Sequence, residues 1–455
     1  MAAASSSPSI MWFRRDLRLS DNPALLAACA AGGEAGVLPL FVLDPALWRP
    51  AGPSRRGYLV AALRELSGSL DGHLAILEGD PVTQVVSAAR ETGARTVHVA
   101  ADYGPYGARR DDAVEKALAD SGVELHRMGS PYAVAPGRIR KGDGTPYQVF
   151  TPFSRAWLDH GWRAPVTAPE QASWLRLGKA EVPETDRPVG LNLPPAGERA
   201  ALSRWHEFLR DRLEGYDAAR DLPGVHGTSG MSVHLKWGEI HPRTMLADVA
   251  RVDSKDAATY RTELAWREFY ADVLWHQPRT AREYLKPEIA GMEYDEPATD
   301  FTAWQEGRTG YPLVDAGMRQ LRATGWMHNR VRMIVASFLV KDMHIEWQHG
   351  ARHFMHWLVD GDLASNQHGW QWVAGSGTDA APYFRVFNPM TQSRKFDPDG
   401  SYLRRWVDEL RDVDPRHVHE PHKDPEGLPT GYPGPLLDHA VERREALARL
   451  ERTKQ

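Results

Sequence analysis

The chain has 455 residues, of which 42% are hydrophobic and 25% charged, and its formal net charge is −5. This composition is ordinary for a globular protein, and the length allows two or three domains. No run of about 18 apolar residues occurs, which excludes a membrane span. The single cysteine, Cys29, excludes an internal disulfide and a four-cysteine metal site, and it fits a reducing cytoplasm. The acidic balance argues against nonspecific coating of nucleic acid but leaves room for a local basic surface.

The first quarter of the chain alternates short strand patterns with helical ones. Residues 1–9, rich in Ala and Ser, predict a disordered extension and not a signal peptide. The pattern predicts strands at 9–13, 37–43, 74–78, 96–100 and 123–127, and helices at 24–31, 58–70, 82–92 and 109–120. We therefore expect an α/β domain over residues 10–130, built on a doubly wound five-stranded parallel sheet. No Gly-x-Gly-x-x-Gly follows the first strand, so an ordinary dinucleotide site is not expected there.

The rest of the chain divides into a linker and a helical half. Residues 131–197 are proline-rich and weakly periodic, which predicts a long linker over the surface. From 198 to 455 the pattern is helical almost throughout, which predicts a larger all-α domain. Most of the 16 tryptophans lie in this half, which suggests that it handles aromatic rings. His417, His419 and His422 look like a zinc cluster, but their Pro-rich, acidic surroundings favour a solvated loop, so no metal is expected.

One candidate site lies on a predicted helix over residues 260–270. Glu263, Trp266, Arg267 and Tyr270 would share one face of that helix. A carboxylate beside an indole and a guanidinium is an unusual core. A Glu–Arg surface pair next to a buried Trp explains the same pattern, and these residues alone leave both interpretations open.

A second candidate helix begins near residue 329. It places Asn329 and Met333 on a stripe that can face a cavity. Arg330 and Arg332 would lie about 200° apart, so one can reach a phosphate while the other pairs inward. A solvated cationic helix is the alternative.

A third segment, residues 360–372, is rich in rings and begins with two acids. Asp360 and Asp362 flank a glycine, which suits hydrogen bonds to the N–H edges of a heterocycle. Metal binding would need more oxygen ligands in regular spacing. The segment therefore favours an aromatic ligand.

In their order along the chain, these segments resemble the photolyase/cryptochrome family. The resemblance extends to residues 12–18, Tyr216, 220–221 and 227–232, and it covers the chain from residue 10 to about 425. It implies that the all-α domain binds FAD, in the reduced form FADH⁻, and DNA. It further implies a class I deoxyribodipyrimidine photo-lyase, an enzyme in which light drives an electron to a flipped-out cyclobutane pyrimidine dimer. UV-damaged DNA is then the partner, and a monomer is the simplest expectation.

The resemblance assigns the FAD phosphates and ribose to one group of residues and the isoalloxazine ring to another. The first group comprises Tyr216, Thr228, Ser229, Met231 and Ser232. The second comprises Arg267, Asp360, Asp362 and Asn366, with Arg332 pairing Asp360. As a bare motif, Thr-Ser-Gly would more often be a helix cap.

Asn366 falls at the position near the flavin N5. A neutral amide can donate a hydrogen bond there and tolerates the anionic reduced flavin. An ionisable carboxylate, as plant cryptochromes carry, would disfavour that charge or supply a proton. The resemblance at this position therefore implies repair and not signalling.

The lesion pocket is implied in the same way. Trp266 and Trp372 would flank the flipped dimer, and Glu263 would donate a hydrogen bond to a pyrimidine carbonyl. Asn329 would bridge lesion and cofactor, and Met333 would pack against the dimer. The paired histidines of (6-4) photolyases are missing, which favours the cyclobutane substrate. The expected DNA phosphate contacts, unless they are scattered surface arginines, are Arg220, Arg330 and Arg385.

The family's electron-transfer chain and antenna site are only partly matched. Trp370 and Trp347 match its first two tryptophans, but the third aligns with Tyr294, which can donate an electron only with loss of its proton. Folate-binding members carry a glutamate where this chain has Gly107. Pro-Tyr-Gly at 105–107, with Arg55 and Lys236, resembles the deazaflavin-binding members more closely. The resemblance thus implies a deazaflavin antenna bound by Arg55, Asp102 and Lys236, with methenyltetrahydrofolate less favoured and an empty site as the alternative.

Two other functions stay open. A cryptochrome-type photoreceptor would bind FAD without repair, but an aspartate at the Asn366 position and a long tail are both missing. A catalytically dead flavoprotein that binds single-stranded DNA is disfavoured because Glu263, Trp266 and Met333 are all present.

Overall fold

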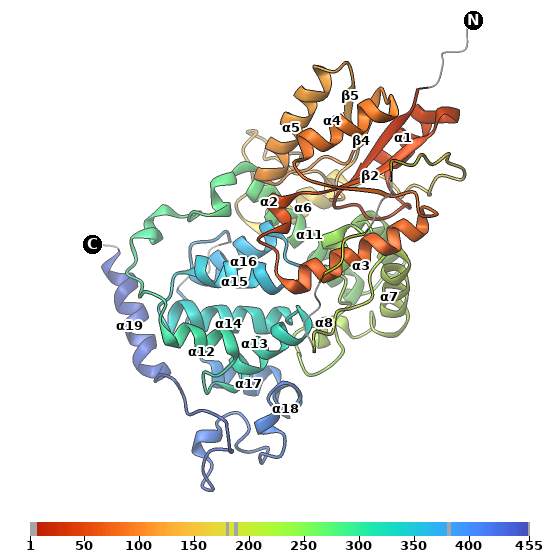
Figure 1. The fold of residues 1–455 in the computed structure, drawn as a ribbon. Coiled ribbons are helices and arrows are strands. Elements are labelled where there is room, and N and C mark those ends of the chain that lie inside the picture. Colours follow the sequence, from red (N-terminus) through yellow and green to blue (C-terminus); the bar gives the residue numbers. More distant parts are fainter. Residues whose placement is uncertain (1–6, 179–181, 186–189, 380–383, 454–455) are drawn as a thin grey trace, which may run out of the picture.

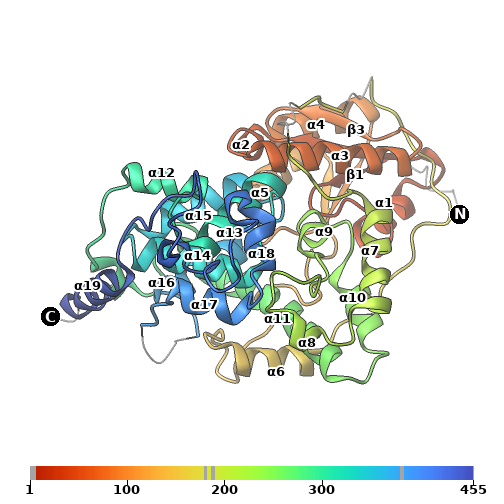
Figure 2. The ribbon, with the colours of Figure 1, turned by 90° about the horizontal axis from the view of Figure 1, so that it is seen from below.

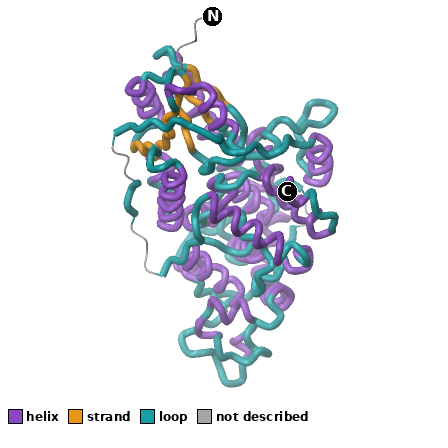
Figure 3. The backbone as a smooth tube through the Cα atoms, turned by 90° about the vertical axis from the view of Figure 1, so that its right-hand side faces the viewer, coloured by secondary structure: helices purple, strands orange, loops and turns teal. Residues whose placement is uncertain are grey.

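An α/β domain and a larger helical domain lie against one another (Figure 1). The structure, a computed structural model, describes residues 7–178, 182–185, 190–379 and 384–453. Residues 1–6 of the expected extension lie outside the described residues, and the first strand begins at Ser9. Figure 3 shows the strands confined to one end of the molecule.

The α/β domain contains a five-stranded parallel sheet of order β3-β2-β1-β4-β5, which confirms the predicted doubly wound fold. The strands are β1 Ser9–Phe13, β2 Val37–Leu43, β3 Ala75–Glu78, β4 Thr96–Val99 and β5 Glu124–Arg127. The helices between them are α1 Pro23–Gly32, the short α2 Pro45–Trp48, α3 Pro53–Ser69, α4 Pro81–Thr92 and α5 Pro105–Ala119. Each begins at a proline, which suits the first helical turn because its missing N–H needs no partner there.

Side chains of the central strand β1 alternate between two cores, one on each face of the sheet. Met11 and Phe13 pack with α1 and α3, whereas Ile10 and Trp12 pack with α4 and α5. The first core also includes Trp237 from the helical domain, so it joins the two domains. From β1 the chain adds β2 and β3 on one side of the sheet, and then β4 and β5 on the other. In folds of this type, ligands bind at the carboxyl ends of the strands where the direction changes.

The connector between the domains contains a helix that the sequence pattern did not reveal. Helix α6, Phe150–His160, buries Phe150, Phe153 and Trp157 in the core of the helical domain. Trp174 pairs with Val37 at the sheet. The connector is therefore partly a component of both domains.

The described part of the carboxy-terminal half contains no strand, which confirms the predicted all-α domain. Figure 2 shows its helices gathered beside the α/β domain, with α19 at the far edge. No described helix is long and apolar enough to cross a membrane. The helices are α7 Glu198–Asp211, α8 Tyr216–Ala219, α9 Ser232–Trp237, α10 Pro242–Val249, α11 Lys255–His276, α12 Thr299–Glu306, α13 Pro312–Thr324, α14 Asn329–Lys341, α15 Trp347–Trp357, α16 Leu363–Ala374, α17 Pro389–Phe396, α18 Ser401–Trp406 and α19 His439–Arg452.

The histidine-rich loop after α18 is not simply solvated, as the sequence suggested. His419 is buried and its Nδ1 lies 2.7 Å from the hydroxyl of Ser393. The loop therefore packs onto α17. Among the described residues, no group of three His, Cys, Asp or Glu side chains is arranged to hold a metal.

Candidate functional site

A cavity of about 550 Å³ lies among the helices of the all-α domain. Its volume suits a cofactor-sized ligand. Nearly all the residues expected around FAD and the lesion line it: Tyr216, Arg220, Ser229, Met231, Ser232, Glu263, Trp266, Arg267, Asn329, Arg330, Arg332, Met333, Asp360, Asp362, Asn366, Trp370 and Trp372. Of the expected FAD, lesion and phosphate residues, Thr228 and Arg385 lie outside the lining.

Helix α11 presents its predicted stripe to this cavity. Glu263, Trp266, Arg267 and Tyr270 all line it. The Arg267 guanidinium donates to the carbonyls of Pro131 and Leu235 at 3.1 and 3.3 Å. Because two backbone carbonyls hold it, the arginine is a fixed positive charge on the cavity wall.

The indole of Trp266 is held by a residue that the sequence analysis missed. Phe150 of α6 stacks on it with ring centroids 3.6 Å apart and planes 7° from parallel. The only advance signal was the aromatic spacing of Phe150, Phe153 and Trp157, at i, i+3 and i+7. Phe150 thus positions Trp266 so that its other face can serve the cavity.

Two arginines expected to contact DNA are ion-paired in this structure. Arg220 lies 2.6 Å from Glu263, and Arg330 lies 2.6 Å from Asp221. Burial raises the pKa of Glu263, and the positive charge of Arg220 opposes that rise. A phosphate would have to compete with a carboxylate for each arginine.

Arg385, the third expected phosphate contact, lies apart from the main cavity. It is exposed, and its guanidinium is 5.6 Å from the ring centre of Phe387. It lines a smaller hollow of about 150 Å³ that shares Trp372 with the main cavity.

Two aspartates form the charged end of the cavity. Arg332 pairs with Asp360 at 2.8 Å, as the resemblance implied. Asp362 caps α16 and pairs at 2.7 Å with Arg15, which follows β1 in the other domain. Burial alone would raise the pKa of Asp362, but Arg15, Lys236 and Arg267 outweigh it and hold that pKa well below its usual range.

Polar atoms at this end fit a heterocyclic ligand. The Oδ1 atom of Asp360 is buried and has no hydrogen-bond partner among the described residues. Such an atom is costly unless a ligand or water satisfies it. FAD, which carries N–H groups on its ring system, therefore suits the donor set here.

Asn366 lines the cavity, but with a geometry that was not expected. Its Nδ2 donates to the carbonyl of Ala351 at 3.2 Å and to Oε1 of Gln367 at 2.7 Å. With both amide hydrogens used, the oxygen is the atom left for a ligand. Donation to a flavin nitrogen would require the contact with Gln367 to be given up.

Another part of the cavity lining carries hydroxyl groups. Ser229 shares a hydrogen bond with Tyr260 at 2.9 Å, and it accepts from the backbone N–H of Met231 at 3.3 Å. Ser232 accepts from the indole of Trp326 at 3.3 Å. These groups suit the ribose and phosphate part of a nucleotide.

A second cavity, of about 130 Å³, lies at the carboxyl ends of the strands of the sheet. The three expected antenna ligands, Arg55, Asp102 and Lys236, all line it. Lys236 also lines the larger cavity. Burial, reinforced by Arg15 and Arg55, lowers the pKa of Lys236 to about 7.

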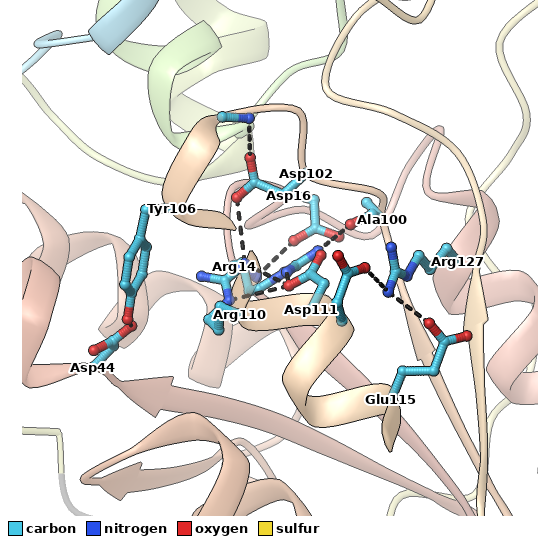
Figure 4. A network of polar contacts seen from close by, with 12 residues as sticks. Arg14, Asp16, Asp44, Ala100, Asp102, Tyr106, Arg110, Asp111, Glu115 and Arg127 are labelled. Carbon is cyan, nitrogen blue, oxygen red and sulfur yellow. Dashed lines mark hydrogen bonds and ion pairs between the residues drawn. The ribbon is translucent and has the colours of Figure 1, made fainter. Parts of the chain in front are cut away.

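Several residues that line this second cavity belong to a network of ion pairs (Figure 4). Asp102 accepts from the backbone N–H of Gly104 at 3.0 Å and from Arg110 at 3.3 Å. Arg110 and Arg14 both pair with the buried Asp111. Most of the charged side chains in the lining are basic, which suits a ligand with an anionic ring or tail.

The fold and the larger cavity define a two-domain protein with a nucleotide-sized, ring-lined site among its helices. Residues 9–170 match the family model described as DNA photolyase, and residues 260–452 match the one described as FAD binding domain of DNA photolyase. The chain belongs to the DNA photolyase family.

Relatives cover nearly the whole chain. The deoxyribodipyrimidine photo-lyase of Agrobacterium fabrum is 38% identical, over 97% of each chain. A class III photolyase of Agrobacterium tumefaciens superposes with a TM-score of 0.94 and 38% identity, covering 100% of this chain and 99% of that one. The prediction of an enzyme of the photo-lyase type with a FAD-binding domain is confirmed, and these relatives imply light-driven repair of pyrimidine dimers in DNA.

Two more distant structures bear on the antenna and on the alternative function. An archaeal photolyase of Sulfolobus tokodaii, described with two FAD molecules, matches with a TM-score of 0.85 and 29% identity over 98% of this chain and 100% of its own. A cryptochrome of Synechocystis sp. PCC6803 matches with a TM-score of 0.90 and 27% identity over the same shares.

Proposed function

We propose that the protein splits cyclobutane pyrimidine dimers in UV-damaged DNA after the dimer flips into the cavity of the helical domain. One observation carries the proposal: Trp266, Trp372 and Glu263 line the same cavity as the acid–arginine pair Asp360–Arg332. A lesion and a cofactor bound there would be neighbours. Bound FAD, reduced and excited by light, would supply the electron that opens the cyclobutane ring.

FAD would be held at its ring by Arg267, Asp360, Asp362 and Asn366. Its ribose and phosphates would be held by the hydroxyl groups and their neighbours: Tyr216, Thr228, Ser229, Met231 and Ser232. The unpaired Oδ1 of Asp360 supports this orientation, since it needs a donor.

The tryptophans would replace the stacking that the dimer loses on leaving the duplex. Aromatic stacking contributes about 1–3 kcal/mol per base, against a flipping cost of a few kcal/mol. Phe150 fixes the plane of Trp266, so little side-chain entropy is lost when the dimer arrives.

Glu263 would donate a proton in a hydrogen bond to a pyrimidine carbonyl as negative charge develops on it. Its raised pKa, caused by burial, makes the protonated form more accessible than on an exposed glutamate. Asn329 would orient the lesion and Met333 would pack against it. Arg220, Arg330 and Arg385 would bind phosphates near the lesion, the first two by exchanging their carboxylates.

The test is repair of an oligonucleotide that carries one cyclobutane dimer. With chemically reduced holoenzyme, repair should require blue light and should fall strongly in a Trp266→Ala variant that retains FAD. A matched duplex with a (6-4) photoproduct should stay unrepaired. Light-induced spectral changes without repair would support the cryptochrome-type photoreceptor instead.

The second cavity is proposed to bind a deazaflavin antenna. The support is its cationic lining by Arg55, Lys236 and neighbouring arginines. Co-expression with deazaflavin synthesis genes should add an absorption band to the purified protein. A second FAD, methenyltetrahydrofolate or an empty site are the other outcomes. The identity of the antenna also helps to assign the class of photolyase. The sequence led us to infer class I, whereas the likeness to the A. tumefaciens protein supports class III.

The domain limits at residues 130 and 197 are likewise proposals. Limited proteolysis with mass spectrometry tests them, and cleavage within 131–197 is expected before cleavage inside either domain. A cytoplasmic location is also a proposal, inferred from the lone cysteine. The monomeric state is a further proposal, which light scattering tests.

A further inference from the structure

Beyond Trp370, the helical domain contains a tyrosine whose hydroxyl is bonded to a carboxylate. Tyr284 is buried, and its ring meets the indole of Trp347 edge-on with centroids 6.0 Å apart. Its hydroxyl donates to Oε1 of Glu346 at 2.8 Å. Glu346 immediately precedes α15, where the helix dipole favours a negative charge.

The tryptophans lead from the large cavity to this pair. Trp370 lines the cavity, and its ring lies on Gly350 of α15, since a β-carbon there would be 2.1 Å from Cη2 of the indole. Trp347 lies one helical turn before Gly350 on the same helix. An electron taken from Trp370 can therefore be replaced from Trp347.

The environment of Trp347 keeps it a strong oxidant once it has lost an electron. Its indole is fully buried, and Nε1 has no hydrogen-bond partner among the described residues. The oxidised ring thus has no adjacent acceptor for its proton, and it cannot relax by deprotonation. Tyr284, whose ring contacts Trp347, can reduce the oxidised indole by giving it an electron.

We propose that Tyr284, with Glu346 as its proton acceptor, is the terminal electron donor that refills Trp347 when light-excited oxidised flavin withdraws an electron through Trp370. One electron passes from Tyr284 to oxidised Trp347, the phenolic O–H bond breaks, and the proton forms an O–H bond on the Glu346 carboxylate. The products are neutral Trp347, a neutral tyrosyl radical and a carboxylic acid. The inference rests on the proposed binding of FAD in the large cavity.

Two other rings near this route lack the acceptor. The hydroxyl of Tyr294 is buried and bonds to no carboxylate among the described residues, although it lies close enough to the hydroxyl of Tyr284 to influence it. Burial raises the pKa of both tyrosines, so the Glu346 carboxylate at 2.8 Å is what distinguishes Tyr284. Trp304 approaches Trp370 at 6.3 Å, but its Nε1 donates to the backbone carbonyl of Val335. A carbonyl cannot take up a proton at neutral pH, whereas a carboxylate within about 2.6–3.2 Å can.

The test is transient absorption after a laser flash on the holoenzyme with its flavin oxidised. The wild type should show decay of oxidised tryptophan matched by growth of a tyrosyl radical, slower in D₂O. Tyr284→Phe should abolish the tyrosyl signal and lengthen the tryptophan signal. Glu346→Gln should slow tyrosyl formation on the order of a hundredfold. Tyr294→Phe removes the competing tyrosine, whose hydroxyl interacts with that of Tyr284, so the tyrosyl signal should persist in this variant with at most a changed rate. Trp304→Phe should leave both signals unchanged.

A tyrosyl radical that survives in Tyr284→Phe, or disappears in Tyr294→Phe, would overturn the proposal. Equal FAD content and circular dichroism establish that the variants fold. Repair with chemically reduced flavin should be unaffected in Tyr284→Phe, because that assay bypasses the relay. Absence of repair with a normal tyrosyl signal would refute the proposed function and leave the relay intact.

Discussion

Gly107 offers a sharp test of the antenna cavity because a single β-carbon there has no room. It would lie 2.1 Å from Oδ2 of Asp102 and 2.2 Å from its Cγ. Asp102 cannot swing away cheaply, because the N–H of Gly104 and the guanidinium of Arg110 both bind its carboxylate. Gly107→Ala must therefore displace an anchored acid.

The expected destabilisation follows from three contributions. Overpacking costs about 1–3 kcal/mol. Loss of a hydrogen bond to a charged group costs about 1.5–3 kcal/mol. Alanine returns about 1 kcal/mol of helix propensity within α5. Together these contributions lower the free energy of unfolding of the α/β domain by about 1.5 to 5 kcal/mol.

Urea unfolding, with hydrogen exchange over residues 96–119 as the local readout, measures this change. Gly68→Ala is the matched control: that glycine is exposed near the end of α3 and its added β-carbon meets nothing within 4 Å. It should be stabilising by about 0.5–1 kcal/mol. If the two variants had equal free energies of unfolding, the inferred clash between a β-carbon at residue 107 and Asp102 would be refuted. By the same geometry, Gly107→Glu should not create affinity for methenyltetrahydrofolate.

Three further outcomes are expected. Asn366→Asp removes both hydrogens now donated to Ala351 and Gln367 and brings an ionisable group to the ring, so the visible spectrum of the flavin as purified should shift; an unchanged spectrum would count against its place beside the ring. Glu263→Ala should lower repair per absorbed photon severalfold more than Glu263→Gln, which retains a donor for the carbonyl; equal losses would argue against that hydrogen bond. The pKa of Lys236 is lowered from 10.5 to about 7, so unfolding takes up a proton between these values and stability rises with pH across that window. Lys236→Met should abolish the rise in a pH series of urea unfolding, and persistence of the rise would assign it elsewhere.

Local chemistry explains why the fold could be predicted so closely. Asp80 caps α4 and Pro81 occupies its first turn, and both signals are visible in the sequence. The missed part of α5 has the opposite cause. It begins at Pro105, four residues before the expected 109, and Gly104 provides no side-chain cap that would mark this start.

The sequence predicted which residues line the site, but it did not predict most of the ion pairs that these residues form. The pairing of Arg332 with Asp360 was implied by the resemblance, whereas helix geometry showed only that one of Arg330 and Arg332 could pair inward. The partners of Arg220, Arg330 and Asp362 come from elements brought together only by tertiary packing; Arg15 and Asp362 are 347 residues apart. Helical geometry specifies which side chains share a face, but it says nothing about which carboxylate will lie opposite.

The long-range pair Arg15–Asp362 also links the two proposed chromophore sites. Lys236 lines both cavities, and Arg15 runs from the end of β1 to the first residue before α16. Arg15 and Lys236 are among the charges that keep the pKa of Asp362 low. A displacement of Asp102 at the floor of the antenna cavity would move charge close to Arg15, since Asp102 is among the charges that influence this arginine. Charges on the two sides of the wall between the cavities therefore influence one another. A substitution on the antenna side can change the pKa of Asp362, the acid that would face the flavin.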